Sequence, residues 1–60
     1  MKLGVTVNLG GYQSMKYESS EHPNNQDCVR DLIVQMQPMA AAYPTVRAKI
    51  DEMKKMYNVV

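Results

Sequence analysis

Apolar and polar residues alternate with a period of two in the first third of the chain, which is the pattern of half-buried β-strands. The alternation is clear over residues 2–9, which are rich in β-branched residues, and weaker over residues 13–19. Gly10 and Gly11 lie between the two segments and favour a turn. The pattern therefore predicts a β-hairpin over residues 1–19.

Parity decides how the two strands pair, because directly opposed residues of a hairpin point to the same face. A two-residue loop at the glycines would oppose apolar to polar residues on both faces. A three-residue loop, residues 10–12, pairs Val7 with Met15 and Val5 with Tyr17 on an apolar face. The other face then carries a candidate interaction surface, unless it is merely solvated. Its residues are Thr6, Asn8, Tyr12, Ser14 and Lys16.

The pattern changes to a helical period after a turn-rich connection, SEHPNN, at residues 20–25. Apolar residues recur at intervals of three and four over residues 25–42, and Asn24 or Asn25 is the expected N-cap. Pro38 interrupts this helix, which either ends near residue 36 or, as we expect, continues with a kink near Pro38.

A second helix is predicted over residues 44–58, since proline is favoured in the first helical turn. Its inner face carries Val46, Ile50 and Met53, followed by either Met56 or Tyr57. The predicted fold is one α+β domain of residues 1–60, a β-hairpin followed by two amphipathic helices.

The size of the chain points to self-association. Sixty residues bury only about 60% of the surface of the unfolded chain, so such domains are marginally stable alone. A single cysteine excludes an internal disulfide, and with one histidine in this composition we expect no metal site. Hairpin edges can pair with another chain, so we expect a homodimer that joins two hairpins into a four-stranded sheet.

Few residues could carry chemistry. Cys28 and His22 are the candidates for a thiol–imidazole pair, but we expect Cys28 to be a small apolar residue at a core or boundary position and His22 to be a solvated loop residue. Asp27 and Asp31 share a helix face near Arg30, and we expect them to be solvated. The glycines match no phosphate-binding motif. The sequence thus predicts a protein that is not an enzyme, with no catalytic residue, cofactor or metal.

Charge and hydropathy limit the classes of partner that we expect for this chain. The formal net charge is +1, which neither demands nor forbids nucleic acid. No apolar run approaches the roughly 20 residues that span a bilayer, and no signal peptide is recognised. Together with the lone cysteine, these features predict a cytoplasmic (intracellular) protein without a membrane partner.

One segment resembles known proteins. Residues 8–16, NLGGYQSMK, resemble the N-L-G-x-Y-x-S-x-K segment of small phage, prophage and archaeal-virus proteins. The resemblance covers nine of the 60 residues and implies an origin in a mobile element, without a mechanism.

We therefore expect a small interaction protein of phage type that binds a host or viral protein. The alternative is nucleic-acid binding through the outer hairpin face. In that case Lys2, Lys16 and the lysines of the second helix would contact phosphates.

Overall fold

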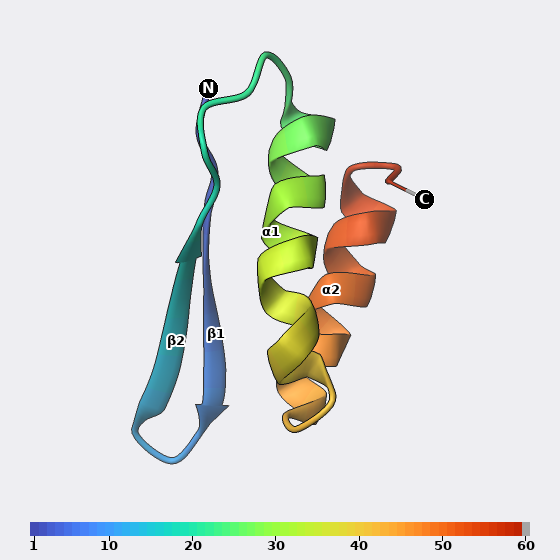
Figure 1. Cartoon of the computed structure of the whole chain (residues 1–60). Coiled ribbons are helices and arrows are strands. Elements are labelled where there is room, and N and C mark those ends of the chain that lie inside the picture. Colours follow the sequence, from blue (N-terminus) through green and yellow to red (C-terminus); the bar gives the residue numbers. More distant parts are fainter. Residues whose placement is uncertain (60) are drawn as a thin grey trace.

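The hairpin and the helices form two layers, with both helices on one face of the sheet (Figure 1). The computed structural model describes residues 1–59. β1 (Gly4–Gly10) and β2 (Gln13–Glu18) are antiparallel, and they are followed by α1 (Asn25–Ala40) and α2 (Pro44–Met56). The predicted α+β class and its element order are confirmed.

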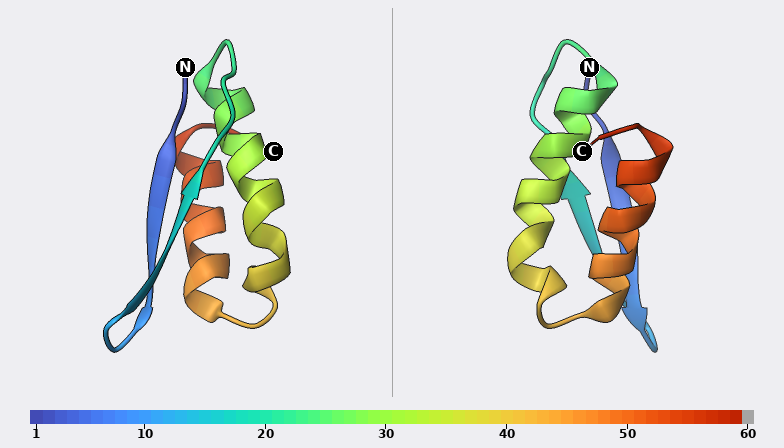
Figure 2. Two further views of the ribbon diagram at one scale, coloured as in Figure 1. Left: turned by 60° about the vertical axis from the view of Figure 1, so that its left-hand side comes forward. Right: turned by 90° about the vertical axis from the view of Figure 1, so that its right-hand side faces the viewer.

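Figure 2 shows the two helices and the two strands from two further directions. α1 packs against β2, α2 packs against β1, and the two helices pack against each other. The hairpin therefore has one face turned to the helices and one face that no other element covers (Figure 1).

The two strands pair in the predicted register between residues 5 and 8 of β1. Apolar residues face each other on the inner side of the hairpin, and polar residues face each other on the outer side. The pairs are Val5–Tyr17 and Val7–Met15 inside, and Thr6–Lys16 and Asn8–Ser14 outside.

The prediction of a three-residue loop is wrong, because the turn is one residue shorter. Gly10 pairs with Gln13, so the turn consists of Gly11 and Tyr12, and Leu9 has no partner at the irregularity between Asn8 and Gly10. Gly10 has a φ of +101° and Gly11 a φ of +59°. A bulge next to a tight turn needs such positive angles, which glycine adopts without steric cost.

Replacing Gly10 by alanine is expected to lower the free energy of unfolding by about 1–3 kcal/mol, because its backbone angle disfavours any side chain. Gly4→Ala is the matched control, since a Cβ at Gly4 would lie 3.7 Å from the Tyr17 carbonyl oxygen, an ordinary contact. That change should stay within about 0.5 kcal/mol. Urea denaturation of both variants checks this, and equal losses would contradict it.

The core lies between the sheet and the helices. It consists of nine buried residues, of which only Val7 comes from the hairpin. The nine are Val7, Val29, Leu32, Ile33, Met36, Val46, Ile50, Met53 and Val59. Leu3, Val5, Leu9 and Tyr17 are partly buried against this cluster. Of the two alternatives for α2, Tyr57 packs on the core and Met56 is exposed.

Ser19 is a polar residue on the inner side of the hairpin, and its hydrogen bonds explain why it can lie there. Its side chain is buried, and its Oγ accepts a hydrogen bond from the Leu3 N–H at 2.9 Å. The Ser19 N–H donates in turn to the Leu3 carbonyl oxygen at 2.9 Å. The two residues therefore satisfy each other where the regular ladder ends.

The helix ends follow local chemistry. The Asn24 side chain caps α1, accepting from the Asp27 N–H at 2.8 Å. α1 continues through the exposed Pro38, so it does not end near residue 36, but it stops two residues before the predicted end. Tyr43 is extended, with a φ of −124°, because the residue before a proline avoids the helical region.

α2 also ends two residues before its predicted limit. Asn58 has a φ of +56°, and the Val59 N–H donates to the Lys54 carbonyl oxygen at 2.9 Å. This left-handed residue closes the helix in the manner of a Schellman motif. The turn directs Val59 back into the core.

Candidate functional site

The outer face of the hairpin gathers the residues expected to form an interaction surface. Thr6 lies opposite Lys16 and Asn8 lies opposite Ser14, so the four side chains form one compact group. All four are exposed, and Tyr12 at the tip of the turn is fully exposed. We call these five residues the outer hairpin face.

Asn8 also holds the turn. Its Oδ1 accepts a hydrogen bond from the Gly10 N–H at 3.1 Å. The side chain is therefore oriented toward the tip of the turn, where Tyr12 is fully exposed. The turn presents the tyrosine ring to solvent on a defined backbone.

A shallow hollow of about 420 Å³ extends this surface toward the start of β1. Gly4, which has no side chain, is among the residues that line it. The side chains around it that carry charge are Lys2, Lys16 and Glu18. The sequence contained a sign of this hollow, because the alternation of apolar and polar residues in β1 places a glycine at an outward position.

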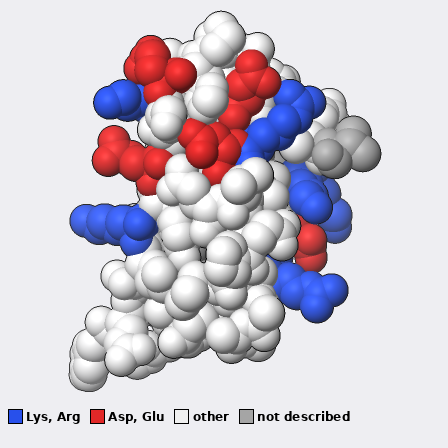
Figure 3. Space-filling model, viewed as in Figure 1, with Lys and Arg blue, Asp and Glu red and all other residues white. Residues whose placement is uncertain are grey.

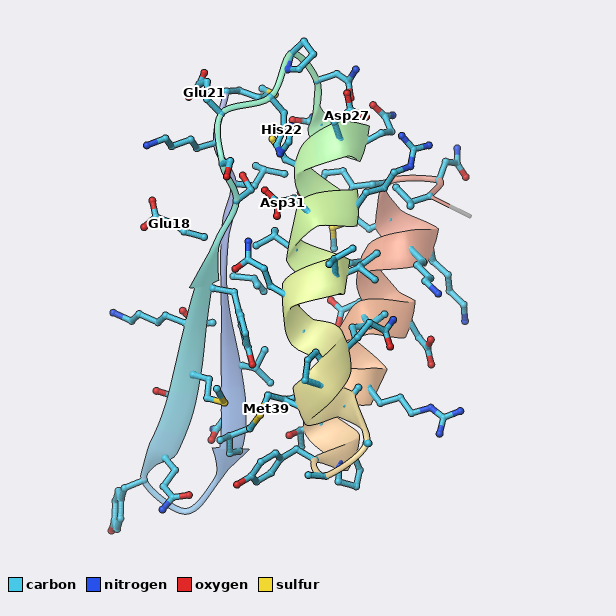
Figure 4. The ribbon with its side chains drawn as sticks, viewed as in Figure 1. Glu18, Glu21, His22, Asp27, Asp31 and Met39 are labelled. Atoms are coloured by element: carbon cyan, nitrogen blue, oxygen red, sulfur yellow. The ribbon has the colours of Figure 1, made fainter. Side chains whose placement is uncertain are left out.

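Asp31 forms a second cluster, between the connection and α1 (Figure 4). Its Oδ2 accepts from the Ser20 N–H at 2.7 Å and lies 2.9 Å from His22 Nε2. Its Oδ1 accepts from Gln35 Nε2 at 3.0 Å. The same Gln35 amide donates to the Glu18 carbonyl oxygen at 2.9 Å.

These hydrogen bonds hold the pKa of Asp31 well below its usual range. The bond from Gln35 contributes most, followed by those from His22 and Ser20, because each favours the carboxylate over the acid. Asp31 is half-buried, and the expectation that it is simply solvated is wrong. Asp27, by contrast, makes only a surface ion pair with Arg30 at 3.0 Å besides its role in the cap.

The thiol and the imidazole have different hydrogen-bond partners. Cys28 is completely buried, and its Sγ donates to the Met1 carbonyl oxygen at 3.3 Å. His22 is engaged by Asp31 instead, so it is not a merely solvated loop residue. Within residues 1–59 no hydrogen bond joins Cys28 to His22, and each side chain is engaged by another group.

Basic residues predominate on the side of the molecule where α2 lies, and both signs of charge occur on the hairpin side (Figure 3). α2 carries four basic residues, Arg47, Lys49, Lys54 and Lys55, against two acidic ones, Asp51 and Glu52. The outer hairpin face contains one lysine, and Lys2 and Glu18 lie beside it. A ligand lying on the outer hairpin face would therefore face few of the basic residues of the chain.

Within residues 1–59, no three His, Cys, Asp or Glu side chains lie together in a way that could hold a metal ion. None of the helices described is both long and apolar enough to cross a membrane.

The chain was compared with protein-family models, with curated proteins and with solved structures, and none of the three comparisons finds a match.

Proposed function

We propose that this chain is a small non-enzymatic interaction protein that binds another protein through its outer hairpin face. One observation carries the proposal: the hairpin is anchored to a core on one side while its opposite side is uncovered. That side presents an exposed tyrosine at its tip and mainly uncharged polar residues beneath it.

The chemistry of the face supports a protein partner. Tyrosine offers a large flat ring and a hydroxyl group at low entropic cost, and it is enriched among residues that dominate binding energy. The hairpin is held by the Ser19–Leu3 bonds and by the Gln35 bond to the Glu18 carbonyl. Such preorganisation reduces the ordering cost of binding.

The segment of residues 8–16 that resembles small phage and archaeal-virus proteins covers most of this face. That resemblance supports the narrower proposal of a phage-type factor whose partner is a host or viral protein.

Nucleic-acid binding is less well supported by the distribution of charge. Affinity for nucleic acid depends on neutralising several phosphates. Lys16 and Lys2 are the lysines near the outer hairpin face, and the acidic residue Glu18 lies beside them. The lysines of α2 belong to the other layer. A protein partner needs no such excess of positive charge.

A photo-crosslinking amino acid at position 12 is expected to capture a protein in the native cells, because Tyr12 is fully exposed at the tip of the proposed contact surface. The same amino acid at position 34 is the matched control, since Val34 is 71% exposed on α1, in the other layer. Adding Lys16→Glu should weaken the position-12 adduct several-fold. Gel analysis and mass spectrometry measure the adducts.

Adducts of equal yield from positions 12 and 34 would contradict the proposal. Binding of mixed-sequence DNA or RNA at about 50 mM salt, lost steeply as salt rises, would support the nucleic-acid alternative instead. Fluorescence anisotropy with labelled oligonucleotides measures this directly.

A further inference from the structure

The two edges of the sheet differ in how they are protected. Natural proteins protect edge strands with charges, prolines or covering elements. β2 carries Lys16 and Glu18, and Gln35 of α1 donates to the Glu18 carbonyl oxygen at 2.9 Å. β1, GVTVNLG, has neither a charged residue nor a proline, and its only protective feature is the irregularity near its end.

The hydrogen-bonding groups on the free edge of β1 can be identified. The Ser19 N–H donates to the Leu3 carbonyl oxygen, so this pair is hydrogen-bonded. Hydrogen-bonded and non-hydrogen-bonded pairs alternate in an antiparallel ladder. The N–H and C=O groups of Gly4, Thr6 and Asn8 therefore point away from β2. Among residues 1–59, no backbone hydrogen bond from another element reaches them.

An apolar groove runs beside this edge. A hollow of about 150 Å³ is lined by Leu3, Gly4 and Val5 of the β1 side and by Met53, Met56 and Tyr57 of the α2 side. Core residues Val29 and Leu32 form its floor. A second hollow continues it along the strand, between Thr6 and residues of α2 that include Lys49 and Glu52. An added strand would cover both hollows.

We propose that a second copy of this chain occupies the edge, with β1 pairing antiparallel to β1 around a two-fold axis at Thr6. Thr6 is the middle of the regular ladder, residues 4–8. In this register Thr6 faces Thr6 of the other copy on the outer side, and Val5 faces Val7 on the inner side. Apolar residues meet apolar ones, a Thr–Thr pair is favourable, and no like charges are opposed.

The flank of α2 is self-complementary in charge. Lys49 and Glu52 lie on the side of α2 next to the β1 edge, 3.7 Å apart. A two-fold axis brings α2 antiparallel to its copy, so that Lys49 of one chain approaches Glu52 of the other. Opposite charges facing each other across an interface favour this association and oppose incorrect partners.

This surface can also supply the buried area that a stable interface needs. Stable interfaces bury about 800 Å² per partner, which is roughly a fifth of the 4167 Å² that the chain exposes. A strand edge alone is smaller than that, but the α2 flank adds to it. Met56 stands at the rim of the groove with 64% of its surface exposed, and the second copy would cover it.

The test is the oligomeric state of the wild-type chain and of Thr6→Glu. Light scattering after size exclusion is expected to give twice the 6.8 kDa chain mass for the wild type. Thr6→Glu should weaken the dimer by about tenfold or more, because it opposes two carboxylates at the two-fold axis. Within one chain the new carboxylate lies opposite Lys16, so the hairpin itself should be preserved.

Ser14→Glu is the matched control, because it adds the same charge to the same face on the other strand. It should leave the dimer intact. Thr6→Pro provides a second test, since it removes an outward-pointing N–H without breaking the pairing with β2. Circular dichroism confirms that each variant is folded.

A wild-type chain that is monomeric from micromolar to millimolar concentration would overturn the proposal. So would a Thr6→Glu variant that dimerises like Ser14→Glu, or a Ser14→Glu variant that is as monomeric as Thr6→Glu. None of these outcomes depends on whether a foreign protein binds the outer hairpin face.

Discussion

Replacing Leu32 by alanine is expected to remove about 2–5 kcal/mol from the free energy of unfolding, because Leu32 is 1% exposed in the centre of α1. Domains of this length have a total stability of about 3–9 kcal/mol. The loss is therefore comparable with the whole stability of the fold. Urea denaturation followed by circular dichroism measures it, and a large part of the variant should be unfolded even without urea.

Val34→Ala tests whether burial is the cause, since Val34 lies on the same helix only two residues away and is 71% exposed. That change should shift the stability by no more than about 0.5 kcal/mol. Similar losses in both variants would contradict burial as the cause, and helix propensity could not explain them, because alanine is the strongest helix former.

Acid is expected to destabilise the protein through Asp31. Its pKa is lowered in the folded state, so the unfolded chain binds more protons in acid, and the stabilisation is complete only above the unfolded value of about 3.9. As the pH falls below that value, stability is lost, with about one proton taken up on unfolding. Acid titrations at several urea concentrations measure the midpoint shift.

Asp31→Asn provides the comparison, because it keeps an acceptor oxygen for Ser20 but cannot ionise. The variant should be less stable than the wild type near neutral pH, and the difference should shrink below about pH 4. Parallel acid profiles for the two proteins would show that other carboxylates cause the acid sensitivity.

Local patterns were sufficient for the elements and for the hairpin register. The alternation around Val5 and Val7 identifies the inner face, and with it the exposure of Thr6 and Lys16 on the outer one. The burial of Val46, Ile50 and Met53 follows from helical spacing. These predictions succeed because strand and helix periodicity link neighbours in sequence directly to faces in space.

Features that depend on distant segments were not predictable in this way. Asp31 acquires its role only because Ser20 and His22 return to α1 from the end of β2. The buried Ser19 needs Leu3 as a partner from 16 residues away. The open edge of β1 depends on the lateral positions of the helices, which periodicity does not determine.

The sequence distance between β1 and α2 has a consequence for synthesis on the ribosome. β1 is made before its covering helix α2 and before Val59, which completes the core. At about 5–20 residues per second, the apolar side of the hairpin waits some seconds for the rest of its core. A nascent hairpin with an uncharged edge is open to incorrect pairing during that interval, so rapid translation or early chaperone contact would raise the yield of folded chain.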